Sequence, residues 1–115
     1  MVAGAAIAVE DGVALARAIS KITSKEHIPL ALSAFEKVRI ERASQMQEAS
    51  LLNGKLWHFP DGPLQRARDA AMAPEVERRP FSHSPNQWSD PATQMWCYAY
   101  DAEGEVDRAW DRIER

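Results

Sequence analysis

The feature that most constrains the fold is a long stretch of helical periodicity at the start of the chain. We expect one helix from Val2 to Thr23, because its larger apolar residues recur every three or four positions. An apolar arc faces a charged one on this helix: Val9, Leu15, Ala16, Ile19 and Ile22 against Glu10, Arg17 and Lys21. Such a helix must cover its apolar face with another element.

A second periodic stretch follows after a short polar connection. Pro29 occupies a position that favours the first turn of a helix, and Asn53 with Gly54 predicts its end near Leu52. Apolar residues at helical spacing give this helix a narrow stripe: Leu32, Phe35, Val38 and Met46. The short link predicts that the two helices form a long antiparallel pair.

The next segment carries more prolines. We expect an extended piece from Lys55 to Pro60, then a third helix over Pro63–Met72 that Asp61 caps and Pro74 stops. From Pro74 to Pro91, prolines and serines predict an irregular segment that wraps a surface.

Two shorter helices are expected after this segment. Asp90 with Pro91 predicts one helix start, and Asp101 can cap the last helix, whose Val106, Trp110 and Ile113 share a face. No stretch predicts a convincing strand. The fold class is therefore mainly α, with a helical region at residues 1–73 and a proline-rich wrapping segment with C-terminal helices at residues 74–115.

Charge and composition exclude several classes of function. The net charge is −3 and the pI is near 5.6, with basic residues interspersed among acids, so we expect no nucleic-acid partner. The apolar start, Met1 to Val9, is followed by Glu10 and Asp11 and has no basic residue before it, so we expect neither a signal peptide nor a membrane span. With Cys97 as the single cysteine, we expect an intracellular, cytoplasmic protein.

Few residues predict chemistry on their own. The three histidines are scattered and Cys97 has no ligand-spaced partner, so no metal site is expected, and a Cys97–His83 nucleophile pair has no support. Asp11 borders the apolar arc of the first helix and needs a partner, which Arg39 or Arg42 can supply from the second helix. We interpret this as a structural ion pair in preference to a catalytic group.

The first turn of the first helix is unusually small. Ala3, Gly4, Ala5 and Ala6 allow another backbone or a flat ligand to approach closely. By themselves, these residues favour tight helix packing over ligand binding.

A resemblance to a known family changes that balance. The string from Gly4 to Asp11, followed by Leu15-Ala16, resembles the G-A-A-M-A-I-E-D-A helix of flavoprotein aromatic hydroxylases. The similarity continues through further matching groups as far as a tail that resembles enzymes of the salicylate hydroxylase type: Phe35-Glu36-Lys37-Val38-Arg39, His58-Phe59-Pro60-Asp61-Gly62-Pro63, Trp88-Ser89-Asp90-Pro91 and Tyr100-Asp101-Ala102. The chain resembles the C-terminal part of these α/β flavoproteins.

The resemblance implies FAD as cofactor, NAD(P)H as co-substrate and an aromatic small molecule as substrate. It implies that Gly4 and Ala5 contact the flavin, since a helix start offers unpaired N–H donors and partial positive charge. Val2-Ala3 replaces the usual Gly-Gln before this glycine, and Ile40-Glu41 replaces a frequent Lys-Pro. The family's dinucleotide-binding G-x-G-x-x-G and Gly-Asp motifs would precede Met1.

Three hypotheses remain open. The first is a partial FAD-dependent monooxygenase, incomplete or acting with a partner chain that supplies the FAD-binding domain. The second is a non-catalytic helical module whose apolar faces drive self-association or partner binding. The third is a small cofactor-free cyclase or isomerase with an aromatic pocket formed by Trp57, Phe59, Trp96 and Tyr98.

Overall fold

The computed structural model describes residues 4–114, which form α-helices, one short 3-10 turn and connecting loops without any strand. The mainly α fold class expected from the sequence is confirmed. In chain order the helices are α1 (Gly4–Ser20), α2 (Ile28–Trp57), α3 (Pro63–Val76), α4 (Pro91–Tyr98) and α5 (Ala102–Ile113), with the 3-10 turn η1 (Lys25–His27) before α2.

These elements divide into two compact units, each described separately below. The middle unit comprises Gln47–Tyr100, and the terminal unit comprises the described residues of Val2–Met46 and Asp101–Arg115. Helix α2 contributes its first part to the terminal unit and its last part to the middle unit. This division by contacts differs from the sequence regions 1–73 and 74–115, which stay a prediction.

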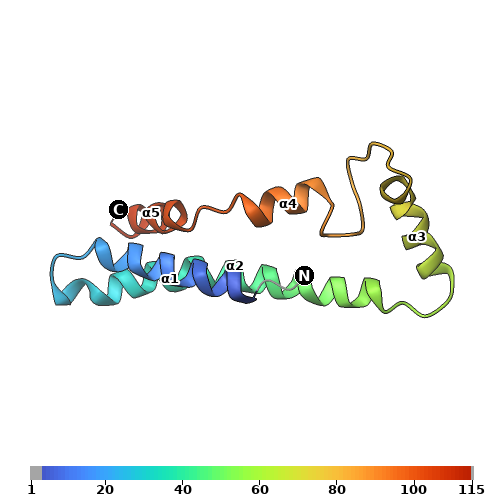
Figure 1. Ribbon diagram of the computed structural model, residues 1–115. Helices are drawn as coiled ribbons and strands as arrows, with labels where there is room; N and C mark the ends of the chain where they lie inside the picture. The colour runs from blue at the N-terminus through green and yellow to red at the C-terminus, as the bar shows by residue number, and fades with distance from the viewer. Residues whose placement is uncertain (1–3, 115) are drawn as a thin grey trace. The chain divides into compact units, whose positions relative to one another are not determined.

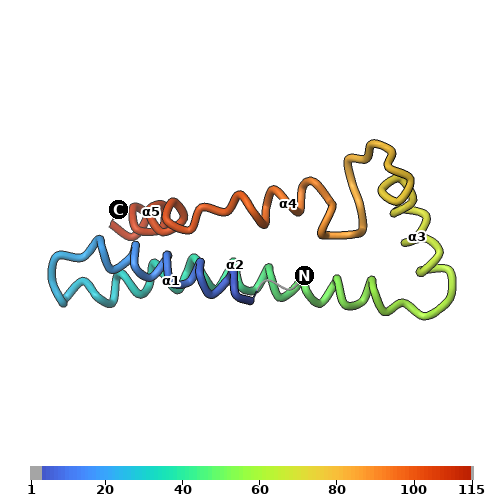
Figure 2. The backbone as a smooth tube through the Cα atoms, viewed as in Figure 1, coloured from blue at the N-terminus to red at the C-terminus, as the bar shows by residue number. Residues whose placement is uncertain are grey.

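The terminal unit contains the antiparallel helix pair that the periodicity predicts. The chain leaves α1, turns through η1 and returns along α1 as the first part of α2 (Figures 1 and 2). Helix α5 packs on α1 and completes a three-helix unit. Residues near the two ends of the chain thus share one core.

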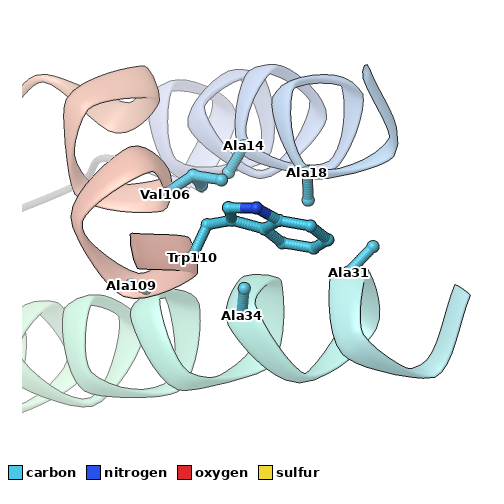
Figure 3. Packing of buried hydrophobic residues seen from close by; sticks show 7 residues of the cluster. All are labelled: Ala14, Ala18, Ala31, Ala34, Val106, Ala109 and Trp110. Carbon is cyan, nitrogen blue, oxygen red and sulfur yellow. The ribbon is translucent and has the colours of Figure 1, made fainter. Parts of the chain in front are cut away.

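The core of the terminal unit is built around one tryptophan. Trp110 of α5 inserts between alanines of α1 and α2, as Figure 3 shows. The fully buried positions on the helix pair are all small: Ala14, Ala18, Ala31 and Ala34. Small side chains let the indole fill the space between the helices. Val106 and Ile113 share the buried face of α5 with Trp110, as expected.

The predicted apolar arc is wrong along α1, although Ile22, which follows the end of α1 at Ser20, packs against the core as expected. Val9 is 67% exposed, and Leu15 and Ile19 are exposed as well, whereas the buried face is formed by Ala14 and Ala18. The sequence interpretation weighted large side chains, but the bulky Trp110 selects small neighbours. On α2, Met46 is buried as expected but Leu32 is exposed.

Helix boundaries in the middle unit differ from several expectations. Helix α2 continues through Asn53 and Gly54 to Trp57, so the expected end near Leu52 and the extended piece after it are wrong. Helix α3 begins after Gly62, without a side-chain cap from Asp61, and includes Pro74. A proline this near the end of a helix removes one hydrogen bond and leaves the remaining turn intact.

The end of α3 and the start of α4 are well defined. Arg78 has a φ of 58°, and the amides of Arg78 and Arg79 donate to the carbonyls of Glu75 and Pro74, which is a Schellman motif without glycine. The segment that follows is irregular up to α4, as its prolines predict. The Asp90 side chain then caps α4 by accepting from the Thr93 amide at 3.0 Å, as expected.

Candidate functional site

The first turn of α1 is the location where the family resemblance implies flavin contacts. Gly4 and Ala5 both lie in the helix and both are exposed. Among the described residues, no atom lies within 4 Å of a Cβ added at Gly4. The amides of this turn carry the partial positive charge of a helix start.

One turn further along α1, the side chain of Arg39 from α2 donates hydrogen bonds to three groups of α1. Its Nε donates to Oδ1 of Asp11 at 2.6 Å, and its Nη2 donates to Oε2 of Glu10 at 3.1 Å and to the carbonyl of Ile7 at 3.4 Å. The residue is only 4% exposed. Buried guanidinium groups need such multiple partners because desolvation of a charge is costly. The structure therefore brings Asp11 and Arg39 together.

Arg42 binds Glu10, whereas the sequence analysis offered it as a partner of Asp11. It is 3% exposed, and its Nε and Nη2 donate to the two carboxylate oxygens of Glu10 at 3.2 and 3.0 Å. The side chain of Glu10 is 18% exposed, whereas that of Asp11 is 46% exposed. Glu10, placed on the solvated arc by the sequence interpretation, is the carboxylate that bridges both arginines.

A spacing signal could have identified Glu10. Glu10 stands four and eight positions before the buried alanines Ala14 and Ala18, and Asp11 stands three and seven positions before them. These spacings place the acids and the alanines on one helix face. The signal was missed because Ala14 and Ala18 were not included in the predicted apolar arc. We call Glu10, Asp11, Arg39 and Arg42 the charge cluster.

A second ionic contact ties α5 to α1. Arg17 Nε and Lys21 Nζ both lie 2.8 Å from Oδ1 of Asp107. The pKa of the Asp107 carboxyl lies well below its usual range. The hydrogen bond from Arg17 is the largest cause, and the hydrogen bond from Lys21 is the next. All three residues were expected on solvated faces, so this contact was missed. It holds α5, and with it Trp110, against α1.

The middle unit contains only an open depression and exposed aromatic side chains as candidate features of a site. An open depression of about 600 Å³ lies along one side of the end of α2, lined by Ser50, Leu51, Gly54, Lys55, His58 and Phe59. In the same unit Tyr98 is 68% exposed and Trp57 is 44% exposed. These side chains are not enclosed, so the geometry gives no support to an aromatic catalytic pocket.

Two absences concern residues 4–114 of the chain. No group of three or more His, Cys, Asp or Glu side chains lies close enough together to hold a metal ion within that range. None of the helices there has both the length and the apolar character needed to cross a membrane.

Comparison with known proteins identifies relatives over most of the chain, although no protein-family model matches it. FAD-dependent monooxygenase OpS4 of Beauveria bassiana is 37% identical over 92% of this chain and 24% of its own length. FAD-dependent monooxygenase atnJ of an Arthrinium species is 35% identical over 91% of this chain, and ntnJ of a Nectria species is 36% identical over 83%. The chain spans about a quarter of the length of these curated relatives. By this similarity the chain resembles one portion of the FAD-dependent monooxygenases.

Proposed function

We propose that this chain supplies the flavin-facing helix of an FAD-dependent aromatic monooxygenase, either as part of a longer protein or together with a partner chain. The observation that carries the proposal is the open first turn of α1, in which a side chain added at Gly4 would meet empty space. The relatives named FAD-dependent monooxygenase match this same chain over most of its length.

In this proposal Gly4 and Ala5 hold the edge of the flavin ring by their backbone amides. Small side chains let the ring approach the peptide groups, and the positive end of the helix favours negative charge on the reduced flavin. FAD, reduced by NAD(P)H, supplies the oxygenation chemistry when it is bound. The contribution of this chain is orientation: α2 and α5 fix the axis of α1.

One helix end is not enough to retain FAD. The cofactor is long, and tight binding requires separate contacts for its adenine, pyrophosphate and flavin parts. The proposal therefore assigns those contacts to a remaining FAD-binding portion. It also leaves the pocket for the aromatic substrate to the complete assembly.

A hybrid enzyme tests the proposal. This chain replaces the matching region of OpS4, and the flavin-to-protein ratio of the purified hybrid is measured by absorbance. The hybrid is expected to retain FAD. Gly4→Leu should lower the flavin content by filling the space that the ring occupies, whereas Gly12→Leu should not, although Gly12 lies on the same helix and also faces open space. A folded hybrid whose flavin content is equal with both substitutions contradicts the proposal.

A second candidate function is a helical interaction module. Large apolar side chains are exposed within the terminal unit, among them Val9 at 67% and Ile40 at 58%. Exposed apolar surface favours self-association or binding to a partner. Light scattering of the purified chain at increasing concentration distinguishes the two: growth in mass with concentration supports the module, and a constant monomer mass opposes it.

A further inference from the structure

The charge cluster has a composition that its structural role alone does not require. It contains two carboxylates on α1 and two guanidinium groups on α2, so its formal charges cancel. An apolar contact of similar volume often stabilises a helix pair as well as a buried ion pair does. The location of the cluster supplies a reason for ionic residues here.

Glu10 and Asp11 lie close to the positive end of the α1 dipole. Glu10 follows Ala5 by five residues, which is about 7–8 Å along the helix axis. Two unpaired carboxylates at that distance would oppose the positive potential of the first turn. Their pairing with Arg39 and Arg42, both nearly inaccessible to water, removes that opposition.

We propose that Arg39 and Arg42 are positioning residues that maintain the positive potential of the first turn of α1 by neutralising Glu10 and Asp11. The inference rests on the proposed function in one respect: a positive first turn would stabilise an anionic edge of a bound cofactor. The electrostatic effect itself involves only residues of this chain. Arg39 also fixes the direction of the turn through its contacts to Asp11 and to the Ile7 carbonyl.

A single thiol in the first turn can report this potential without any flavin. Ala5→Cys places the probe at an exposed helical position, and Cys97→Ser removes the natural thiol. The pKa of the probe is measured from its rate of alkylation against pH, at low ionic strength. Negative charge nearby raises a thiol pKa and positive charge lowers it.

The electrostatic role predicts shifts of opposite sign. Arg42→Gln leaves the charge cluster with one excess negative charge and should raise the probe pKa, whereas Glu10→Gln leaves it with one excess positive charge and should lower the probe pKa. A unit charge about 10 Å away in water-like surroundings shifts a pKa by about 0.3 unit. The double variant Glu10→Gln/Arg42→Gln should return to the parent value, and salt at about 1 M should suppress every shift.

A purely structural role predicts a different pattern. Fraying of the helix start would move the probe toward an ordinary thiol pKa in both single variants, so shifts of the same sign overturn the proposal. Asp11→Asn provides a milder test if Glu10→Gln does not fold, because Asp11 is partly exposed and Arg39 retains Glu10. It should also lower the probe pKa, and an unchanged pKa counts against the role.

A charge-matched control lies at the opposite end of the helix pair. Glu26 is in η1, beyond the far end of α1, so Glu26→Gln changes the net charge equally but should leave the probe unchanged. Because no flavin is needed, failure of this test leaves the flavin-contact proposal to be judged by the hybrid enzyme. Loss of flavin in the Gly4→Leu hybrid together with same-sign shifts here would keep the function and reject the electrostatic role.

Discussion

At the scale of single residues, Glu10 has more influence on the structure than its sequence position indicates. It accepts hydrogen bonds from both buried arginines, and Asp11 accepts one from Arg39. Removal of one partner of a buried ion pair leaves an uncompensated charge. The consequence of a substitution should therefore follow the number and burial of the contacts that it breaks.

Glu10→Ala is expected to destabilise the chain by about 3 kcal/mol or more, since it removes carboxylate contacts from two buried guanidinium groups. Asp11→Ala should cost only about 1 kcal/mol, because Arg39 keeps Glu10 and the Ile7 carbonyl. Urea unfolding of the two variants measures the difference. An equal loss, or a larger loss for Asp11→Ala, would show that the contacts are ranked incorrectly.

The lowered pKa of Asp107 predicts that the stability of the folded chain depends on pH. Its contacts with Arg17 and Lys21 depress its pKa in the folded chain, so they stabilise the fold above the unfolded-state pKa of about 3.9. This contribution is lost as the pH falls toward the lower folded-state pKa. Wild type should therefore be more stable than Asp107→Asn at pH 7, and the gap should narrow below about pH 4. A gap that is constant from pH 7 to strongly acidic conditions contradicts the assignment.

At the scale of elements, helix existence followed from the sequence better than helix boundaries did. The caps of α4 and α5 were predicted because Asp90 and Asp101 are ordinary capping residues. The end of α3 was missed because a non-glycine residue, Arg78, takes the left-handed conformation that a Schellman motif requires. The charge cluster was predicted in part, since Asp11 and Arg39 were paired but Glu10 was assigned to the wrong face.

Arg78→Gly tests the assigned end of α3. A left-handed conformation strains a residue with a Cβ, and glycine removes that strain at some cost in unfolded-state entropy. We expect a net stabilisation of about 0.5–1 kcal/mol, measured by thermal unfolding. Arg79→Gly is the matched control and should give no gain, because Arg79 is not a positive-φ residue. A gain of the same size in both variants would argue against the motif.

Trp110→Ala tests the core of the terminal unit. The indole fills the space between α1 and α2, so its removal should leave a cavity and cost about 3–5 kcal/mol. Trp88→Ala is the control, since Trp88 is 43% exposed and lies in the middle unit. Chemical denaturation followed by circular dichroism measures both. A small effect for Trp110 would mean that the three helices do not share this core.

At the scale of the whole molecule, the chain combines a small, alanine-rich core with much exposed apolar surface. It spans about a quarter of the length of its monooxygenase relatives. The sequence could indicate the family through the small first turn and the adjacent acids, and it predicted the contact between Asp11 and Arg39. It did not predict that Glu10 joins Arg39 and Arg42, because those residues lie 29 and 32 positions away, beyond the reach of local periodicity.

The isolated chain should not bind FAD tightly. A titration that follows FAD fluorescence is expected to show no saturable change at micromolar concentrations, because one helix end supplies too few contacts. A saturable one-to-one titration would mean that this chain binds FAD on its own. The proposal that a remaining FAD-binding portion supplies the other contacts would then be wrong.

Hydrogen–deuterium exchange of the hybrid enzyme tests the central claim most directly. Amide exchange in the first turn of α1 is compared with and without bound FAD, and the peptide covering α5 serves as an internal reference. The account predicts slower exchange at Gly4 and Ala5 when FAD is bound, with little change in α5. Unchanged exchange at Gly4 and Ala5 in a hybrid that demonstrably holds FAD would contradict it.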